Sequence, residues 1–234
     1  MNDSRWERVA AGTGIVWVVL TAVGNIIQTN PPGVNDPVGK ITSYYLDNRS
    51  AILLGEFLIG IGAVFFLWFA GSLYGHFRRA EGEPGRLSAI VMGAGVWTLG
   101  VFLVEGALYT ALAYKIAGEG DTRITQAVWD IANVAATFRG YTVGILFVAI
   151  AVAVLRTGAL PLWIGTSAVV LGVLQLVRGL GVFADSGPFV LGGAFSGIGF
   201  ALDGIWTLVT SVVLMRRVGH GEGQGLMTER VTQG

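Results

Sequence analysis

Six charged side chains interrupt the long apolar stretches of this 234-residue sequence: Glu56, Glu105, Asp130, Arg139, Arg178 and Asp203. One charge at the centre of a lipid bilayer costs about 2.5–3.5 kcal/mol even on a lenient scale, so these groups are expected to face one another or water. Two of the four acids can pair with the two arginines, and two are left over. Leftover carboxyls are suited to binding a cation or a proton, and the mixed charges equally suit a zwitterionic or amine-containing solute.

The candidate substrate- or ion-binding residues are five of these charges and one amide, namely Glu105, Asp130, Arg139, Gln175, Arg178 and Asp203. We expect Asp203 and Glu105 to bind the cation or proton, and the arginines to pair with them or with an anionic group. A structural interpretation stays open beside this one. In it the charges only tie helices together, Glu56 is solvated near a helix end, and the amides only form hydrogen bonds between helices.

The composition indicates a membrane protein. Hydrophobic residues make up 53% and charged residues 13% of the sequence, with a mean hydropathy of +0.66, whereas a soluble domain carries about 25% charged residues. Because there is no cysteine, disulfides, thiolate nucleophiles and iron–sulfur clusters are excluded. The two histidines, His76 and His220, are too few for a three-histidine zinc site and poorly placed for a bis-histidine haem. We expect no cofactor and no metal. Zero net charge without a basic block argues against nucleic acid.

Six apolar stretches are each long enough for the roughly 20 residues of a spanning helix. Breaks rich in glycine, proline and acidic residues separate them, and we place the spans at Val9–Gln28, Ala51–Gly75, Leu87–Tyr114, Gln126–Leu155, Leu162–Phe183 and Phe189–Met215. The runs are continuous rather than alternating, which excludes a β-barrel. The predicted fold is therefore all-α, a single six-helix transmembrane domain over residues 1–217, followed by a flexible cytoplasmic tail over 218–234.

The basic residues predict the orientation. With both termini in the cytoplasm, nine basic residues lie inside: Arg5, Arg8, Arg78, Arg79, Arg86, Arg156, Arg216, Arg217 and Arg230. The outer side then holds four, which are Lys40, Arg49, Lys115 and Arg123. The positive-inside rule favours this topology, and the expected location is the cell membrane.

A short amphipathic helix is expected in the first outer loop. Asn35-Asp36 offers a helix cap, Pro37 suits the first helical position, and Val38, Ile41, Tyr44 and Tyr45 recur at helical spacing. This helix is either a packed loop or a lid over a binding site.

The polar residues of all six spans fall at one predicted depth. A helix rises about 1.5 Å per residue, so Asn25, Glu56, Glu105, Gln175 and Asp203 all lie in the outer half of their spans or near its middle. The inner halves are almost wholly apolar. We therefore expect a polar chamber that opens outward, with the fourth span, polar on two faces, at the centre of the bundle.

Three motifs resemble those of a known family: Tyr44-Tyr45-Leu46-Asp47-Asn48-Arg49, Phe65-Phe66-Leu67-Trp68-Phe69-Ala70-Gly71-Ser72-Leu73 and Gly158-Ala159-Leu160-Pro161-Leu162-Trp163-Ile164-Gly165. Together they resemble a large, mainly actinobacterial group of six-helix integral membrane proteins described only as a domain of unknown function. The resemblance implies a fold and a membrane location, and it implies no activity.

The leading hypothesis is thus a membrane protein that binds or translocates a small solute or ion in this chamber, with proton coupling as one form of it. A non-catalytic accessory or scaffold subunit is the alternative, with a protein partner or a second copy of the chain. An intramembrane enzyme that uses Glu105 and Asp203 as acid and base comes third, because the sequence contains no recognised catalytic motif.

Overall fold

The structure is a computed structural model that describes residues 3–184 and 186–232, with side chains for 5–184 and 186–217. About 85% of the chain is helical, and the described residues contain no strand. The helices are α1 (Asp3–Ile27), α2 (Val38–Asp47), α3 (Arg49–Glu81), α4 (Arg86–Tyr114), α5 (Thr122–Thr157), α6 (Leu162–Arg178) and α7 (Ala194–Thr232), with short 3-10 helices η1 (Ile116–Glu119) and η2 (Gly179–Phe183).

Six of these helices are long and apolar enough to cross a membrane: α1, α3, α4, α5, α7, and α6 together with η2. The predicted all-α class is confirmed, and so is the presence of six long apolar helices that could span a membrane. The membrane side on which the termini and α2 lie stays a prediction.

The predicted start of the last span at Phe189 is wrong, because α7 begins at Ala194. Residues 186–193 instead form turns, in which the Gly193 amide donates to the Val190 carbonyl at 2.8 Å and the Phe195 amide to the Pro188 carbonyl at 3.1 Å. Gly192 lies in the left-handed region with φ 67°, a conformation that glycine adopts without strain. These turns shorten the helical part of the span and form a compact loop before α7.

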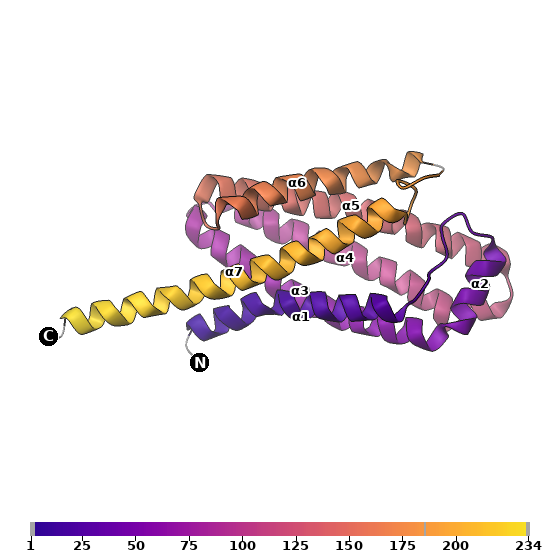
Figure 1. Ribbon diagram of the computed structural model, residues 1–234, viewed down its shortest axis with the longest axis horizontal. Coiled ribbons are helices and arrows are strands. Elements are labelled where there is room, and N and C mark those ends of the chain that lie inside the picture. The colour runs from indigo at the N-terminus through magenta and orange to yellow at the C-terminus, as the bar shows by residue number, and fades with distance from the viewer. Residues whose placement is uncertain (1–2, 185, 233–234) are drawn as a thin grey trace.

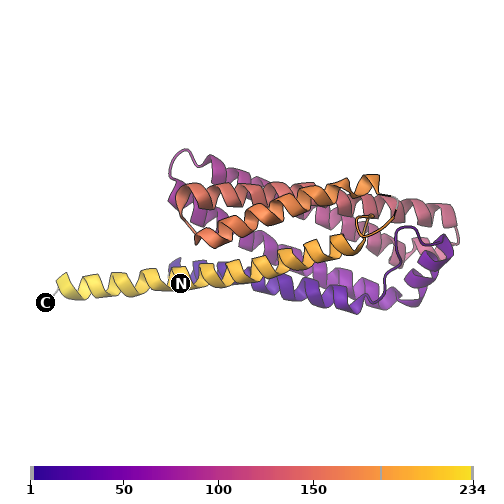
Figure 2. The same cartoon turned by 45° about the horizontal axis from the view of Figure 1, so that its top comes forward.

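The spans run roughly along the long axis of the molecule (Figure 1), and their contacts connect them in a ring. Around the ring, α7 packs on α1, α1 on α3, α3 on α4, α4 on α5 and α5 on α6. Only sparse contacts between α6 and α7 close the ring. Figure 2 shows the same separation of α6 from α7 in a turned view. In α5, 61% of the most apolar stretch is buried, against at most 39% in any other span. α5 is therefore the most buried span, although it lies in the ring between α4 and α6 and not at the predicted centre.

The two chain termini lie toward the same end of the bundle (Figure 1). At this end Arg79 of α3 pairs with Glu7 of α1 at 2.8 Å, and Arg217 of α7 donates to the Ala159 carbonyl between α5 and α6 at 2.6 Å. α1 begins and α7 leaves the bundle toward this end (Figure 1). The backbone of α7 continues to Thr232, but the side chains of the predicted tail, 218–234, lie outside the described residues, and its flexibility stays a prediction.

At the opposite end α2 lies across the ends of α3, α4 and α5. Ile41 and Tyr45 are buried there against Ile52, Leu112 and Trp129. The N-terminus of α2 differs from the prediction, because Pro37 occupies the N-cap position and not the first helical position. The Asp36 carboxylate does not cap the helix and instead accepts hydrogen bonds from the Gly33 amide and the Lys40 ammonium group.

The backbones of α1 and α3 come close together at Gly24 and Gly55. A Cβ on Gly55 would lie 2.6 Å from the Gly24 carbonyl oxygen, and a Cβ on Gly24 would lie 2.7 Å from the Gly55 carbonyl oxygen. Small residues at such crossings let helix backbones meet in a bilayer.

Gly55→Ala is expected to lower the free energy of unfolding by about 1–3 kcal/mol, because the added methyl group must push α1 away from α3. The matched control is Gly60→Ala in the same helix, where the new Cβ meets nothing within 4 Å and better helix propensity favours alanine. Titration with a denaturing detergent measures the free energy of unfolding of both variants. Equal stabilities of the two variants would contradict the assigned contact.

Candidate functional site

Two cavities lie inside the ring of spans. The polar cavity has a volume of about 90 Å³ and is lined by Asn25, Glu56, Glu105, Tyr109 and their apolar neighbours. The aromatic cavity has a volume of about 60 Å³ and is walled by aromatic and aliphatic side chains around Thr98, Asp203 and Thr207. One water needs roughly 10–15 Å³ on this measure, so each cavity has room for several waters or one small organic group. The expected single chamber is therefore divided in two.

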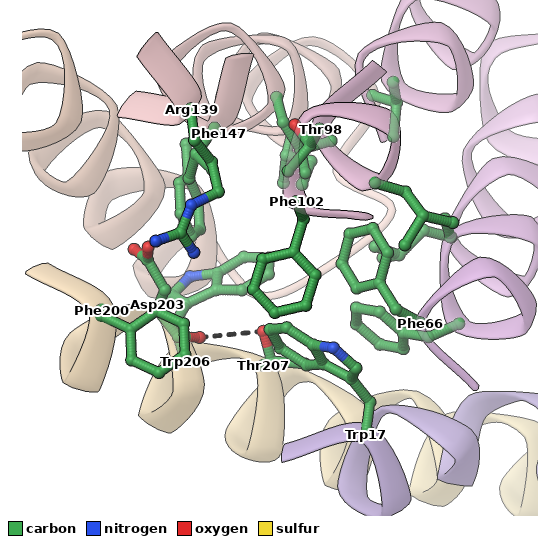
Figure 3. A pocket seen from close by; sticks show the side chains of 18 residues that line it. Trp17, Phe66, Thr98, Phe102, Arg139, Phe147, Phe200, Asp203, Trp206 and Thr207 are labelled. Atoms are coloured by element: carbon green, nitrogen blue, oxygen red, sulfur yellow. Dashed lines mark hydrogen bonds between the residues drawn. The ribbon is translucent and has the colours of Figure 1, made fainter. Parts of the chain in front are cut away.

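Helical spacing places the lining side chains. On α4, Thr98, Phe102 and Glu105 follow one another at intervals of four and three residues, and on α7, Phe200, Asp203 and Thr207 do so at intervals of three and four. Such residues share one face of a helix, which here faces the interior of the ring. The Thr207 hydroxyl donates to the Asp203 carbonyl at 2.8 Å (Figure 3).

Arg139 separates the two cavities. Its guanidinium lies 5.1 Å from the ring centroid of Phe102 and 5.3 Å from that of Phe200, within the range of cation–π attraction. These three side chains line both cavities, and we call them the partition. In Figure 3 the guanidinium points toward the Asp203 carboxylate from the side of α5.

On the side of the polar cavity, Glu105 pairs with Arg139. Arg139 Nε lies 3.0 Å from Glu105 Oε2, and both side chains are about 10% exposed. The only hydrogen bond of good direction in the pair, from Nη2 to Oε1, is long at 3.5 Å, and Nε and Oε2 lack a well-aligned partner among the described residues. The charges therefore compensate each other without the closed two-bond geometry of the strongest arginine–carboxylate pairs.

Asp203 is held differently, by a neutral group. Gln175 of α6 donates to Asp203 Oδ2 at 2.6 Å, and Gly199 leaves the space for this amide, since a Cβ there would lie 3.2 Å from Gln175 Nε2. The other oxygen, Oδ1, is buried without a hydrogen-bond partner among the described residues.

The other two predicted site residues lie elsewhere. Arg178 is buried, donates to the Ala136 carbonyl at 2.9 Å and faces the 186–193 turns. Asp130 is exposed and accepts from Gln126 of its own helix at 2.8 Å. Asp130 lies on the outward face of α5 beside the exposed Ile131, whereas Trp129 and Asn133 at the same level of the helix are buried. Neither side chain lines either cavity.

Glu56 lines the polar cavity, where Gln28 donates to its Oε1 at 3.1 Å. Gly106 makes room for it, because a Cβ there would lie 2.9 Å from Glu56 Oε2. Nearby, burial raises the pKa of the Tyr44 hydroxyl, and the charge of Glu56 raises it further.

Aromatic side chains that were not predicted from the sequence complete the site, chiefly Trp17, Phe102, Phe200 and Trp206. A signal for two of them was present, since Phe102 and Phe200 each stand three residues before Glu105 and Asp203. Aromatic residues are abundant in every span, however, so this spacing alone does not distinguish a cavity wall from lipid-facing residues.

No group of three or more histidine, aspartate or glutamate side chains in the part of the chain described here could hold a metal ion. Comparison with protein-family models, with curated proteins and with solved structures finds no significant match. The class of protein is therefore indicated by the fold alone, and the six long apolar helices indicate a multi-pass membrane protein.

Removing one member of the buried pair, as in Arg139→Met, is expected to lower the free energy of unfolding by about 3–5 kcal/mol, because the other charge stays buried and unpaired. Glu105→Gln/Arg139→Met should be more stable than either single variant. Detergent-induced unfolding of all four proteins measures the coupling.

Glu7→Gln supplies the control, since the Arg79–Glu7 pair has a similar distance of 2.8 Å but side chains that are 57% and 39% exposed. Glu7→Gln should lower the free energy of unfolding by less than about 1 kcal/mol. Additive effects of the Glu105 and Arg139 substitutions would show that this pair carries no coupling.

Proposed function

We propose that this membrane protein binds a small polar or charged solute in its central cavities and passes it across the bilayer. The observation that carries the proposal is the partition. A single arginine, held between two rings, separates a polar cavity with Glu105 from an aromatic cavity with Asp203.

Buried charges that line a cavity are typical of solute and proton pathways. Arg139 is poised between two carboxylates, since it pairs with Glu105 at 3.0 Å and points toward Asp203 (Figure 3). Moving the guanidinium from Glu105 to Asp203 would join the two cavities and keep the arginine paired, and Glu105 would then have to take up a proton or a cation to avoid a buried unpaired charge. The imperfect geometry of the Glu105 pair favours such a movement.

In this proposal both termini lie in the cytoplasm of a cell whose membrane holds the chain, as the basic residues favour. The polar cavity then faces outward, and α2 covers it as a lid with Tyr44 at its edge. Anchoring of α2 by Tyr45, whose ring lies 6.0 Å from that of Trp129, supports a hinged rather than a free lid.

One observation favours the scaffold alternative. Each buried charge already has a protein partner: Arg139 has Glu105, Asp203 has Gln175, and Arg178 has a backbone carbonyl. In a scaffold these contacts would only fix the helices, and the cavities would stay closed to solutes.

The absence of cysteine from the sequence allows a direct test, because a single introduced thiol has no background. Asn25→Cys reports on the polar cavity and Thr98→Cys on the aromatic cavity. Val104→Cys, on the outer surface of α4 and 57% exposed in the isolated chain, is the lipid-facing control. The probe is a charged, membrane-impermeant methanethiosulfonate applied to right-side-out and inside-out vesicles.

We expect Asn25→Cys to react from the outer side. Thr98→Cys should react from both sides, at least tenfold faster than Val104→Cys, because passage requires that both faces reach the aromatic cavity. If Thr98→Cys is as inert as Val104→Cys from both sides, the translocation proposal fails and the scaffold is favoured.

A further inference from the structure

We infer that the aromatic cavity is a binding site for a small organic cation, an amine or a quaternary ammonium group, with Asp203 as its counter-ion. The inference rests on the proposed function, because it names the class of solute that the central cavities take.

The charges around the cavity leave one carboxylate without an ion pair. Arg139 is balanced by Glu105 at 3.0 Å. Asp203 has only the neutral Gln175 as a side-chain hydrogen-bond partner. The Arg139 guanidinium points toward the Asp203 carboxylate (Figure 3), but among the described residues no basic group lies within the 4.0 Å of an ion pair. Arg178, the other buried cation, directs its Nη2 to a backbone carbonyl and does not line this cavity. A bound cation would neutralise Asp203 in a place where an unpaired charge is costly.

The walls suit a cation as well. Trp17 and Phe66 meet at a centroid distance of 5.0 Å, Phe147 and Trp206 also at 5.0 Å, and Figure 3 shows the two pairs on different sides of the cavity. Tryptophan gives the strongest cation–π attraction, and cages of such rings recognise quaternary ammonium groups. The cavity already holds one cation in this way, since Arg139 lies between the rings of Phe102 and Phe200.

Two unpartnered polar atoms on the wall add to the case. The hydroxyl of Thr98 and the indole nitrogen of Trp17 are buried without a hydrogen-bond partner among the described residues. They offer a solute hydroxyl or a bound water a partner beside the charged group. Because the rings come from five spans, we expect the cation to enter as a free solute and not as the headgroup of an intact lipid.

Choline and 3,3-dimethyl-1-butanol test this inference, because they have nearly the same shape and differ in charge. Isothermal titration calorimetry of the full chain in detergent micelles should show that choline binds at least tenfold more tightly than the neutral alcohol. Asp203→Asn should weaken choline binding at least tenfold. Asp130→Asn removes an exposed carboxylate outside the cavity and should leave the affinity within twofold.

A second pair of variants keeps the test valid if Asp203→Asn does not fold. Trp17→Leu removes a cavity ring whose indole nitrogen has no partner to lose, and Trp97→Leu removes a ring that is 56% exposed on the outside of α4. Choline affinity should fall at least threefold in the first and stay unchanged in the second.

Equal binding of choline and the neutral alcohol would overturn the inference, as would unchanged choline binding in both cavity variants or no choline binding at all. None of these results affects the thiol reactivity of Thr98→Cys. Failure of the cation assignment and failure of solute passage are therefore distinguishable.

Discussion

The buried ion pair between Arg139 and Glu105 is the interaction on which the rest of the interior depends. Each side chain is about 10% exposed, and neither charge would be tolerated alone in a low-dielectric interior. The pair ties α5, the most buried span, to α4, and it directs the guanidinium between Phe102 of α4 and Phe200 of α7. One paired charge thereby fixes the relative positions of three helices and divides the interior into two cavities.

The surroundings of this pair are arranged to leave space rather than to fill it. Gly106 leaves room for the Glu56 carboxylate, and Gly199 leaves room for the Gln175 amide. Part of the packed core lies beyond the cavities, toward the end where α1 begins, and there Phe77, Leu160 and Leu214 are buried together. The interior thus combines a well-packed end with cavities around the ion pair, an arrangement that is compatible with the proposed solute pathway.

Much of the fold follows from hydropathy, and much of the site does not. The six spans were predictable because roughly 20 apolar residues between glycine- and proline-rich breaks have few other stable arrangements. The turns before Ala194 were not, because Phe189 and its neighbours are as apolar as a helix, and the glycines that break it are frequent within the spans as well. Among the charges, Glu105 and Arg139 could be expected to pair, but which acid each arginine takes depends on the packing of α6 against α5. Arg178 shows this, since it is bonded to a backbone carbonyl of α5, and Asp130 shows that helical phase alone does not establish burial near a helix end.

The partition of Phe102, Arg139 and Phe200 separates the two cavities, and shortening one of its rings tests this separation most directly. In a protein carrying Thr98→Cys, the added substitution Phe102→Ala should raise the rate of modification from the side of the polar cavity at least tenfold. Leu103→Ala, which shortens an adjacent side chain that is 47% exposed, should leave that rate unchanged. A partition between the cavities predicts this difference. Equal modification rates of Thr98→Cys with Phe102→Ala and with Leu103→Ala would contradict it.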